Sequence, residues 1–183
     1  MQTIPTRVKD VLILEPRLFA DARGYFFESW NARRFREIAG GETVFVQDNE
    51  SRSRRGVLRG LHYQVEQAQG KLVRVARGSV FDVCVDLRRS SPTFGLWDGV
   101  ELSEENHRQL WIPAGFAHGY LVLSESADFL YKTTDFYAPE HERTILWNDA
   151  RLNIAWPLDP GQRPTVSAKD AAGLPFAQAP LFE

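Results

Sequence analysis

The chain has 183 residues, a formal net charge of −2, and ordinary fractions of hydrophobic (43%) and charged (25%) residues. This length predicts a single domain over residues 1–183 with a sizeable core. Because charges of both signs are interspersed, no broad basic field is available to bind nucleic acid or a membrane surface. No segment approaches the roughly 20 apolar residues of a membrane span, and the N-terminus lacks the apolar core of a signal peptide, so we expect a soluble protein.

Short apolar runs with the alternation of strands occur along most of the chain. In chain order they cover residues 11–15, 24–30, 56–64, 71–78, 80–88, 109–113, 120–124 and 128–137. Turn signals lie at DARG (21–24), ARGS (76–79), RSSPTFG (89–95) and IPAGFAHG (112–119). Strands this short, at roughly 8–12-residue spacing, predict an all-β sandwich or closed jelly roll rather than βαβ units.

Few helices are predicted. The first lies in NARRFREIAGG, where Asn31 is a candidate N-cap and Gly40–Gly41 a stop. A shorter one begins near Ser167 in SAKDAAG. Because SAKD fits the S-x-x-[DE] capping pattern, the local sequence predicts that Asp170 is a helix-cap residue.

The segment VFDVCVDL (80–87) is expected to be a strand with one packed face. Its odd positions, such as Phe81 and Val83, are apolar, whereas Asp82 and Asp86 share the other face with Cys84. Cys84 is the only cysteine and cannot form an internal disulfide, so a buried thiol in the reducing cytoplasm is the expectation.

The strand GVLRGLHYQ (56–64) contains two costly polar groups, Arg59 and His62. An odd separation places them on opposite faces of a regular strand. Both point into one cavity if Gly60 carries a β-bulge, a frequent reason for glycine inside a strand. Arg59, between leucine and glycine, is expected to be a buried cation that needs an anion. A lone strand histidine is more often a structural residue.

Several blocks occur in an order that is far more specific than any single motif. They are DARGYFFESWN (21–31), QDNESRSRRGVLRGLHYQ (47–64), GKLVRVARGSVFDVCVDLR (70–88), ENHRQLWIPAGFAHGY (105–120), DFLYKTTDFYAPEHER (128–143) and SAKD (167–170). Together they closely resemble the dTDP-4-dehydrorhamnose 3,5-epimerase family over nearly the whole chain. The resemblance implies a cupin-type jelly roll with a few short peripheral helices. It also implies an isomerase that converts dTDP-4-dehydro-6-deoxy-D-glucose to dTDP-4-dehydro-L-rhamnose.

The resemblance implies four catalytic residues. His62 is the base, and the imidazole pKa of about 6.5 suits that role near neutral pH. Tyr131 is the opposing acid, and Lys71 lies beside the C4 oxygen of the sugar, where a cation stabilises an oxyanion. Asp170 orients the imidazole and stabilises its protonated form. From the residues alone, Tyr131 and Lys71 read as an ordinary strand tyrosine and a strand-end lysine.

The resemblance also implies a set of ligand-contacting residues: Arg23, Glu28, Gln47, Asp48, Asn49, Arg59, His118, Tyr137, Glu142 and Lys169. Because no glycine-rich phosphate loop is present, the guanidinium groups of Arg23 and Arg59 are expected at the diphosphate. Tyr137 would stack on the thymine ring. On an unbroken strand Tyr131 and Tyr137 would lie roughly 20 Å apart, a distance that a bend near Asp135 would shorten.

The chain departs from the usual family spelling at Tyr120, in HGY rather than HGF, and at Phe136, in DFY rather than DYY. Neither position is a predicted catalytic residue, so only fine substrate preference is affected. The four histidines form no HxH or HExxH pair, and we expect neither a metal nor another cofactor.

The family further implies a homodimer in which an N-terminal strand joins the sheet of the neighbour. Two other functions stay open from the sequence. One is an epimerase acting at C3 or C5 alone, or a ketoisomerase of a related dTDP-4-keto-6-deoxy sugar. The other is a jelly roll that binds a sugar or nucleotide without catalysis.

Overall fold

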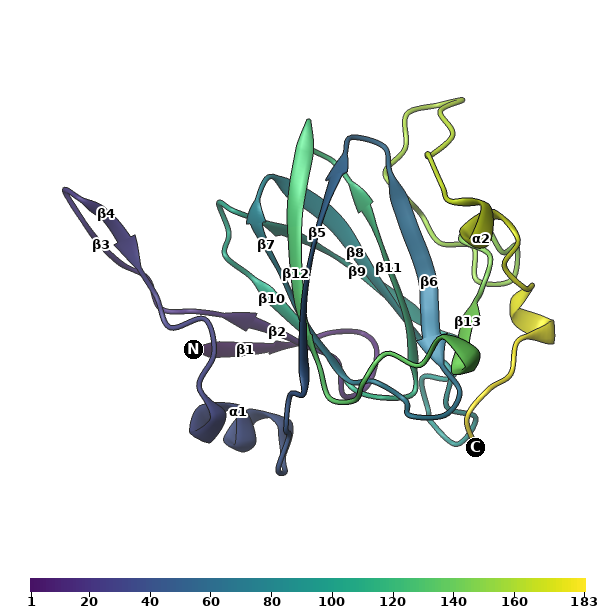
Figure 1. The fold of residues 1–183 in the computed structure, drawn as a ribbon, viewed down its shortest axis with the longest axis horizontal. Helices are drawn as coiled ribbons and strands as arrows, with labels where there is room; N and C mark the ends of the chain where they lie inside the picture. The colour runs from purple at the N-terminus through teal and green to yellow at the C-terminus, as the bar shows by residue number, and fades with distance from the viewer.

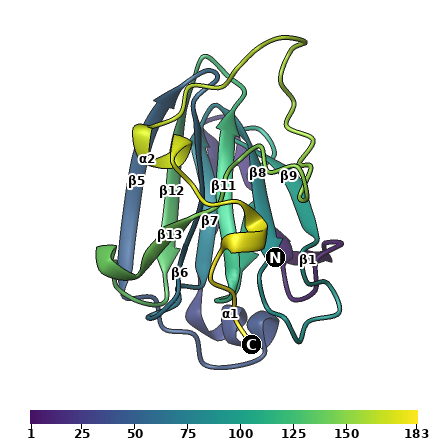
Figure 2. The ribbon, with the colours of Figure 1, turned by 90° about the vertical axis from the view of Figure 1, so that its right-hand side faces the viewer.

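A computed structural model describes residues 1–183, which form two antiparallel sheets facing each other (Figure 1 and Figure 2). In the six-stranded sheet the order is β1 (Gln2–Pro5), β2 (Leu12–Glu15), β10 (Gln109–Ile112), β7 (Lys71–Arg77), β12 (Ser126–Thr133) and β5 (Gln47–Arg54). In the five-stranded sheet it is β13 (Glu142–Thr144), β6 (Leu58–Gln64), β11 (Phe116–Val122), β8 (Ser79–Asp86) and β9 (Trp97–Ser103). The predicted all-β jelly roll is confirmed.

The main core lies between the sheets. There Val73 and Phe129 of the six-stranded sheet belong to the same buried cluster as Val80 and Leu102 of the five-stranded sheet. Such interdigitation of two inner faces is typical of packed sheets. The structure contains no helix long and apolar enough to cross a membrane.

The C-terminal segment adds a layer on the other face of the five-stranded sheet (Figure 2). In this layer Leu152 and Phe176 pack against Val83 of β8. Both faces of β8 are therefore buried, and Asp82 and Asp86 are 0% exposed. The prediction of one packed face was wrong, because the alternation within β8 gives no sign of a distant covering segment.

The two predicted helices are confirmed as α1 (Ala32–Ala39) and α2 (Ala168–Ala171). The Asn31 side chain accepts from the first-turn backbone N–H groups of α1, and Gly40 ends the helix with a φ of 74°. Short 3-10 turns, η1 and η2, cover Pro139–His141 and Phe176–Gln178. The hairpin of β3 (Phe19–Asp21) and β4 (Gly24–Phe26) projects away from both sheets (Figure 1).

β1, β3, β9 and β13 were not predicted, and the boundaries of other strands differ most at three places. The predicted turn at 112–119 ends earlier, because β11 begins at Phe116. The strand predicted over 24–30 stops at Phe26, and the one over 128–137 stops at Thr133. β5 was not predicted, because its sequence QDNESRSR has no apolar alternation. As an edge strand, it needs no apolar outer face.

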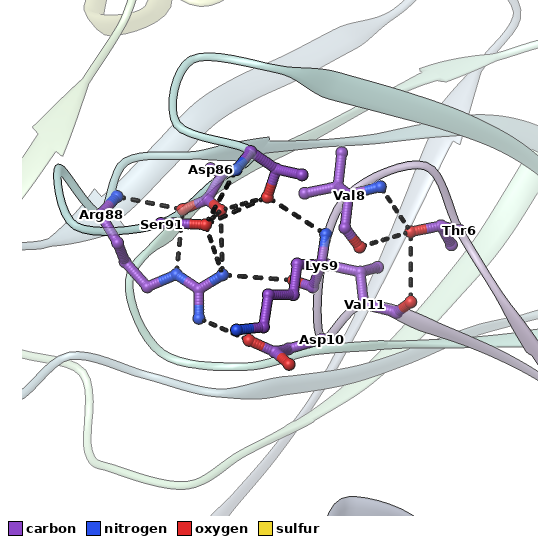
Figure 3. Close-up of polar contacts among 9 residues, drawn as sticks. Thr6, Val8, Lys9, Asp10, Val11, Asp86, Arg88 and Ser91 are labelled. Carbon is purple, nitrogen blue, oxygen red and sulfur yellow. Dashed lines mark hydrogen bonds and ion pairs between the residues drawn. The ribbon is translucent and has the colours of Figure 1, made fainter.

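A polar network fastens the loop after β1 to the loop after β8 (Figure 3). Asp86 is 0% exposed and accepts two bonds of 2.9 Å from the Arg88 guanidinium. Arg88 also donates to Asp10 at 2.8 Å and to the Lys9 carbonyl at 3.2 Å. Burial opposes ionisation of Asp86, but the donors from Arg88 and Ser91 hold its pKa below the usual range.

Substituting Arg88→Met is expected to lower the free energy of unfolding by about 3 kcal/mol, because it leaves a buried carboxylate without its cation. Urea unfolding at neutral pH measures the change. Arg89→Met is the matched control, since Arg89 is half-exposed and pairs only with the nearly fully exposed Glu183. Equal unfolding free energies for the two variants would show that the network does not fasten the loops.

Candidate active site

A cavity of about 340 Å³ opens between the two sheets. Residues of six strands, and Gln69 and Tyr137 from the loops before β7 and after β12, form its wall. The lining residues are Gln47, Asn49, Ser51, Arg59, His62, Tyr63, Gln64, Gln69, Lys71, His118, Gly119, Tyr120, Phe129, Tyr131, Tyr137 and Glu142. Three of the four predicted catalytic residues and six of the ten predicted ligand contacts are in this set.

A bulge in β6 brings Arg59 and His62 into the same cavity. Arg59 pairs with Tyr120 and His62 with His118, so three steps along β6 match two along β11. The extra residue lies next to Gly60, whose φ is 122°. A Cβ at Gly60 would lie 2.7 Å from the His118 carbonyl oxygen, which excludes larger residues. The bulge proposed for GVLRGLHYQ is confirmed.

Arg59 is not the buried cation that the sequence predicted. Its side chain is exposed, and its Nε donates to Ser53 Oγ at 3.0 Å rather than to a carboxylate. The bulge turns the guanidinium toward the edge of the cavity, where solvent reaches it. An Arg59 without an acidic partner is available to an anionic ligand.

The two roles considered for Asp170 occur together. The backbone N–H of Asp170 donates to Ser167 Oγ at 3.1 Å, as a capped α2 requires. Its carboxylate also reaches across the fold, with Oδ1 2.5 Å from His62 Nε2. Although burial opposes ionisation, the bond with His62 and then that with Ser167 hold the pKa of Asp170 below its ordinary value.

A second imidazole–carboxylate pair lies in the cavity wall. His118 Nε2 is 2.9 and 3.0 Å from the two carboxylate oxygens of Asp82. Burial raises the pKa of Asp82, against the attraction of His118 and of Lys71. Asp82 was not predicted as a site residue. The only signal for it was an acidic residue inside an apolar strand.

Lys71 begins β7 and points into the cavity. Burial lowers its pKa to about 8, although Glu142 and Asp82 favour the charged form. The ammonium group is therefore mostly protonated at pH 7, and it loses its proton within the range of ordinary assays. Lys71 can act as a nearby cation whose charge depends on pH.

Tyr131 and Tyr137 both line the cavity because the chain bends after β12. Thr133 Oγ1 donates to the Asp135 carbonyl at 2.8 Å and closes this bend, which confirms the bend considered near Asp135. Burial raises the pKa of Tyr131, so its phenol stays protonated near neutral pH. The half-exposed Tyr137 donates its hydroxyl hydrogen to Glu142 Oε2 at 2.7 Å.

Four predicted contact residues do not line this cavity. Arg23 lies at the tip of the β3–β4 hairpin, with its side chain 90% exposed. Glu28 accepts a bond from Asn31 after the hairpin. Asp48 lies 2.5 Å from Lys132 on the other face of β5. Lys169 reaches the site through Glu142, with Nζ 2.5 Å from Oε2.

β5 supplies a row of polar side chains to the site, although the sequence did not predict a strand in this segment. Gln47, Asn49 and Ser51 alternate inward, and the Ser51 and Tyr120 hydroxyls are 2.9 Å apart. The Asn49 Nδ2 atom is buried without a hydrogen-bond partner in the protein, so this donor is available to a ligand. Alternation of polar residues in QDNESRSR was the signal that could have found the row.

No group of three or more His, Cys, Asp or Glu side chains is gathered as metal ligands. The cavity instead combines the His62–Asp170 pair, the Tyr131 phenol and the Lys71 amine. An imidazole backed by a carboxylate can remove a proton, a phenol can donate one, and an ammonium can stabilise an oxyanion. The arrangement suits proton transfer at a carbon acid.

Comparison with known proteins agrees with this chemistry. The family model described as dTDP-4-dehydrorhamnose 3,5-epimerase matches residues 5–178. The dTDP-4-dehydrorhamnose 3,5-epimerases of Pseudomonas aeruginosa and Salmonella typhimurium are 63% and 59% identical, over 100% of this chain and 99% and 100% of theirs. A solved structure, the dTDP-6-deoxy-D-glucose-3,5-epimerase of Legionella pneumophila in complex with dTDP-4-keto-L-rhamnose, has a TM-score of 0.95 and 52% identity. That match covers 100% of this chain and 97% of the other.

Proposed function

The chain belongs to the dTDP-4-dehydrorhamnose 3,5-epimerase family, a family of isomerases, and from this premise we propose its substrate and the roles of its residues. The substrate is dTDP-4-dehydro-6-deoxy-D-glucose, and the product is dTDP-4-dehydro-L-rhamnose. The observation that carries the proposal is the joint presence of the His62–Asp170 pair, Lys71 and Tyr131 around one cavity.

Each epimerisation is a proton removal followed by a proton return on the opposite face. The C4 ketone acidifies the C–H bonds at C3 and C5. His62 takes the proton, and the electron pair of the C–H bond moves onto the C4 oxygen as an enolate. Tyr131 then donates a proton to the same carbon from the other face. The sequence is redox-neutral, so its electrons balance without a cofactor.

Two charges in the site support this route. The Asp170 carboxylate, 2.5 Å from His62, stabilises the imidazolium that forms. The Lys71 ammonium is placed at the enolate oxygen, where one such donor contributes on the order of 3 kcal/mol to the transition state. His118, held by Asp82, lines the same cavity. In this proposal it contacts the sugar.

The nucleotide occupies the more open end of the site in this proposal. Tyr137 is half-exposed and offers its ring face to the thymine. Gln47 and Asn49 offer amide groups, and Arg59 has no acidic partner, which suits a diphosphate. Glu142 lies beside Tyr137 at the same edge.

We propose that the protein is a single-domain, cytoplasmic homodimer. In this dimer Arg23, Glu28 and Asp48 contribute to a ligand site that the two copies form together. The hairpin that carries Arg23 leaves Phe19, Tyr25 and Phe26 more than half exposed. A second copy of the chain can cover these rings and receive Arg23 at its own cavity. Light scattering at micromolar concentration should give about twice the 20.9 kDa chain mass, and a monomer would contradict the dimer.

Heavy water tests the reaction directly. The purified protein, incubated with dTDP-4-dehydro-6-deoxy-D-glucose in deuterium oxide, should incorporate deuterium at both C3 and C5, followed by NMR. Label at one carbon only would indicate a mono-epimerase, and migration of the carbonyl would indicate a ketoisomerase. No exchange at either carbon would contradict the proposed function.

The low pKa of Lys71 predicts an alkaline limit to activity. As the pH rises through about 8, Lys71 loses its charge, so kcat/KM of the free enzyme should fall about tenfold per pH unit above that value. In Lys71→Arg the guanidinium keeps its charge, so this alkaline limb, the fall of kcat/KM above pH 8, should be absent below pH 9. It should be absent even if the maximal rate of the variant is lower than that of the wild-type protein. Lys132→Arg, outside the cavity, is the control and should retain the limb. A limb near pH 8 in Lys71→Arg would assign it to another group.

A further inference from the structure

Helix α2 is connected to both ends of the cavity through two consecutive residues. Asp170 bonds the imidazole of His62 at 2.5 Å. Lys169 lies 2.5 Å from Glu142, which accepts the hydroxyl of Tyr137 at 2.7 Å. A continuous series of short polar contacts therefore runs from the exposed ring of Tyr137 to His62.

We infer that α2 couples the nucleotide end of the cavity to the catalytic base. A nucleobase stacked on Tyr137 fixes the Tyr137 hydroxyl, and through Glu142 and Lys169 it fixes α2 and the Asp170 carboxylate. Lys169 is then a positioning residue for His62. The inference rests on the proposed function, in which Tyr137 holds the base of the nucleotide and His62 removes the proton.

The helix is suited to pass on a displacement because it is short and internally bonded. Ser167 Oγ accepts the Asp170 N–H, and the Ala172 N–H reaches the carbonyl oxygens of Ala168 and Lys169 at 3.1 and 3.2 Å. The backbones of Lys169 and Asp170 lie within this bonded turn. A shift of one residue is therefore a shift of the other.

The contacts at the two ends of the series lie in places of low solvent exposure. The side chains of Asp170 and Glu142 are 4% and 14% exposed, so their charges are weakly screened. Burial opposes ionisation of Glu142, but the bonds from Lys169 and Tyr137 hold its pKa below the usual range. Removing the Lys169 cation leaves Glu142 with Tyr137 as its only close side-chain donor.

The backbone of Glu142 is held by strand pairing in the five-stranded sheet, whereas its side chain reaches Lys169 and Tyr137. β13 pairs with β6, with Glu142 opposite Gln64 and Thr144 opposite His62. The carboxylate of Glu142 and the imidazole of His62 thus face one cavity from adjacent strands. In this inference the coupling therefore runs through side chains and α2, not through a movement of the sheet.

Titration with dTDP, followed by the imidazole ¹⁵N shifts of His62 and by calorimetry, tests the inference. In the wild-type protein, dTDP should shift the His62 resonances even though it lacks the hexose that would contact that ring. In Lys169→Met, dTDP should still bind, but the His62 shift should be lost. Turnover in this variant should fall about tenfold, in the range of ordinary coupling between sites. Lys169→Arg should restore both.

Lys9→Met is the matched control, because Lys9 lies in the loop of Figure 3 and does not line the cavity. This variant should behave as the wild-type protein. A His62 shift that persists at saturation in Lys169→Met would overturn the coupling, as would a variant that only weakens dTDP binding. Failure of dTDP to bind the wild-type protein would instead overturn the proposed function itself.

Discussion

His62→Asn is expected to slow deuterium exchange at both C3 and C5 by about 10³-fold, because a positioned general base contributes on the order of 10²–10⁴-fold. Asparagine keeps a polar group beside Asp170 but cannot accept a proton near neutral pH. The Kd for dTDP should change by no more than a few-fold, since His62 lies at the sugar end of the proposed site. Single-turnover exchange followed by NMR, together with calorimetry, measures both quantities.

The control for this substitution is His141→Asn. His141 lies in η1, next to the site in sequence, but it does not line the cavity. Its replacement should leave exchange within a few-fold of the wild-type rate. Exchange at one carbon that survives in His62→Asn would mean that the two carbons use different bases.

Tyr131→Phe is expected to separate exchange from inversion. His62 can still remove a proton and return a deuteron to the same face, so label should enter the substrate without a change of configuration. Formation of epimerised product should fall about 10²–10⁴-fold, the usual contribution of one positioned acid. NMR of the sugar protons distinguishes the labelled substrate from the epimers.

Tyr120→Phe is the matched control for the phenol. Tyr120 lines the same cavity, and its hydroxyl lies 2.9 Å from that of Ser51. Its substitution removes a hydroxyl from the wall without removing the proposed acid, so inversion should continue. Loss of inversion in Tyr120→Phe, with retention in Tyr131→Phe, would reassign the acid.

Local pattern was sufficient for much of the fold. The caps of α1, the strand character of residues 71–77 and the bulge at Gly60 follow from propensity, alternation and the special conformations of glycine. β5 and the start of β11 were missed for one physical reason. The inner face of β5 lines a polar cavity, and β11 passes close to the β6 backbone at Gly119. Neither sequence therefore follows the apolar alternation of a packed strand.

The site was predicted unevenly for a similar reason. Family resemblance named His62, Lys71, Tyr131 and Asp170, of which the first three line one cavity and the last contacts His62. The contact of Asp170 with His62 spans 108 positions in sequence, which no local pattern encodes. Arg59 was expected to be buried because its neighbours are apolar, whereas the bulge, a tertiary feature, directs it to the solvent-exposed edge of the cavity.

The most direct test is a crystal structure of His62→Asn with dTDP-4-dehydro-6-deoxy-D-glucose bound, in which turnover is slowed. The sugar ring should lie between residue 62 and Tyr131, with its C4 oxygen within hydrogen-bond distance of Lys71. Residue 62 and Tyr131 facing the same side of the ring, or a sugar bound outside this cavity, would contradict proton transfer between these two groups.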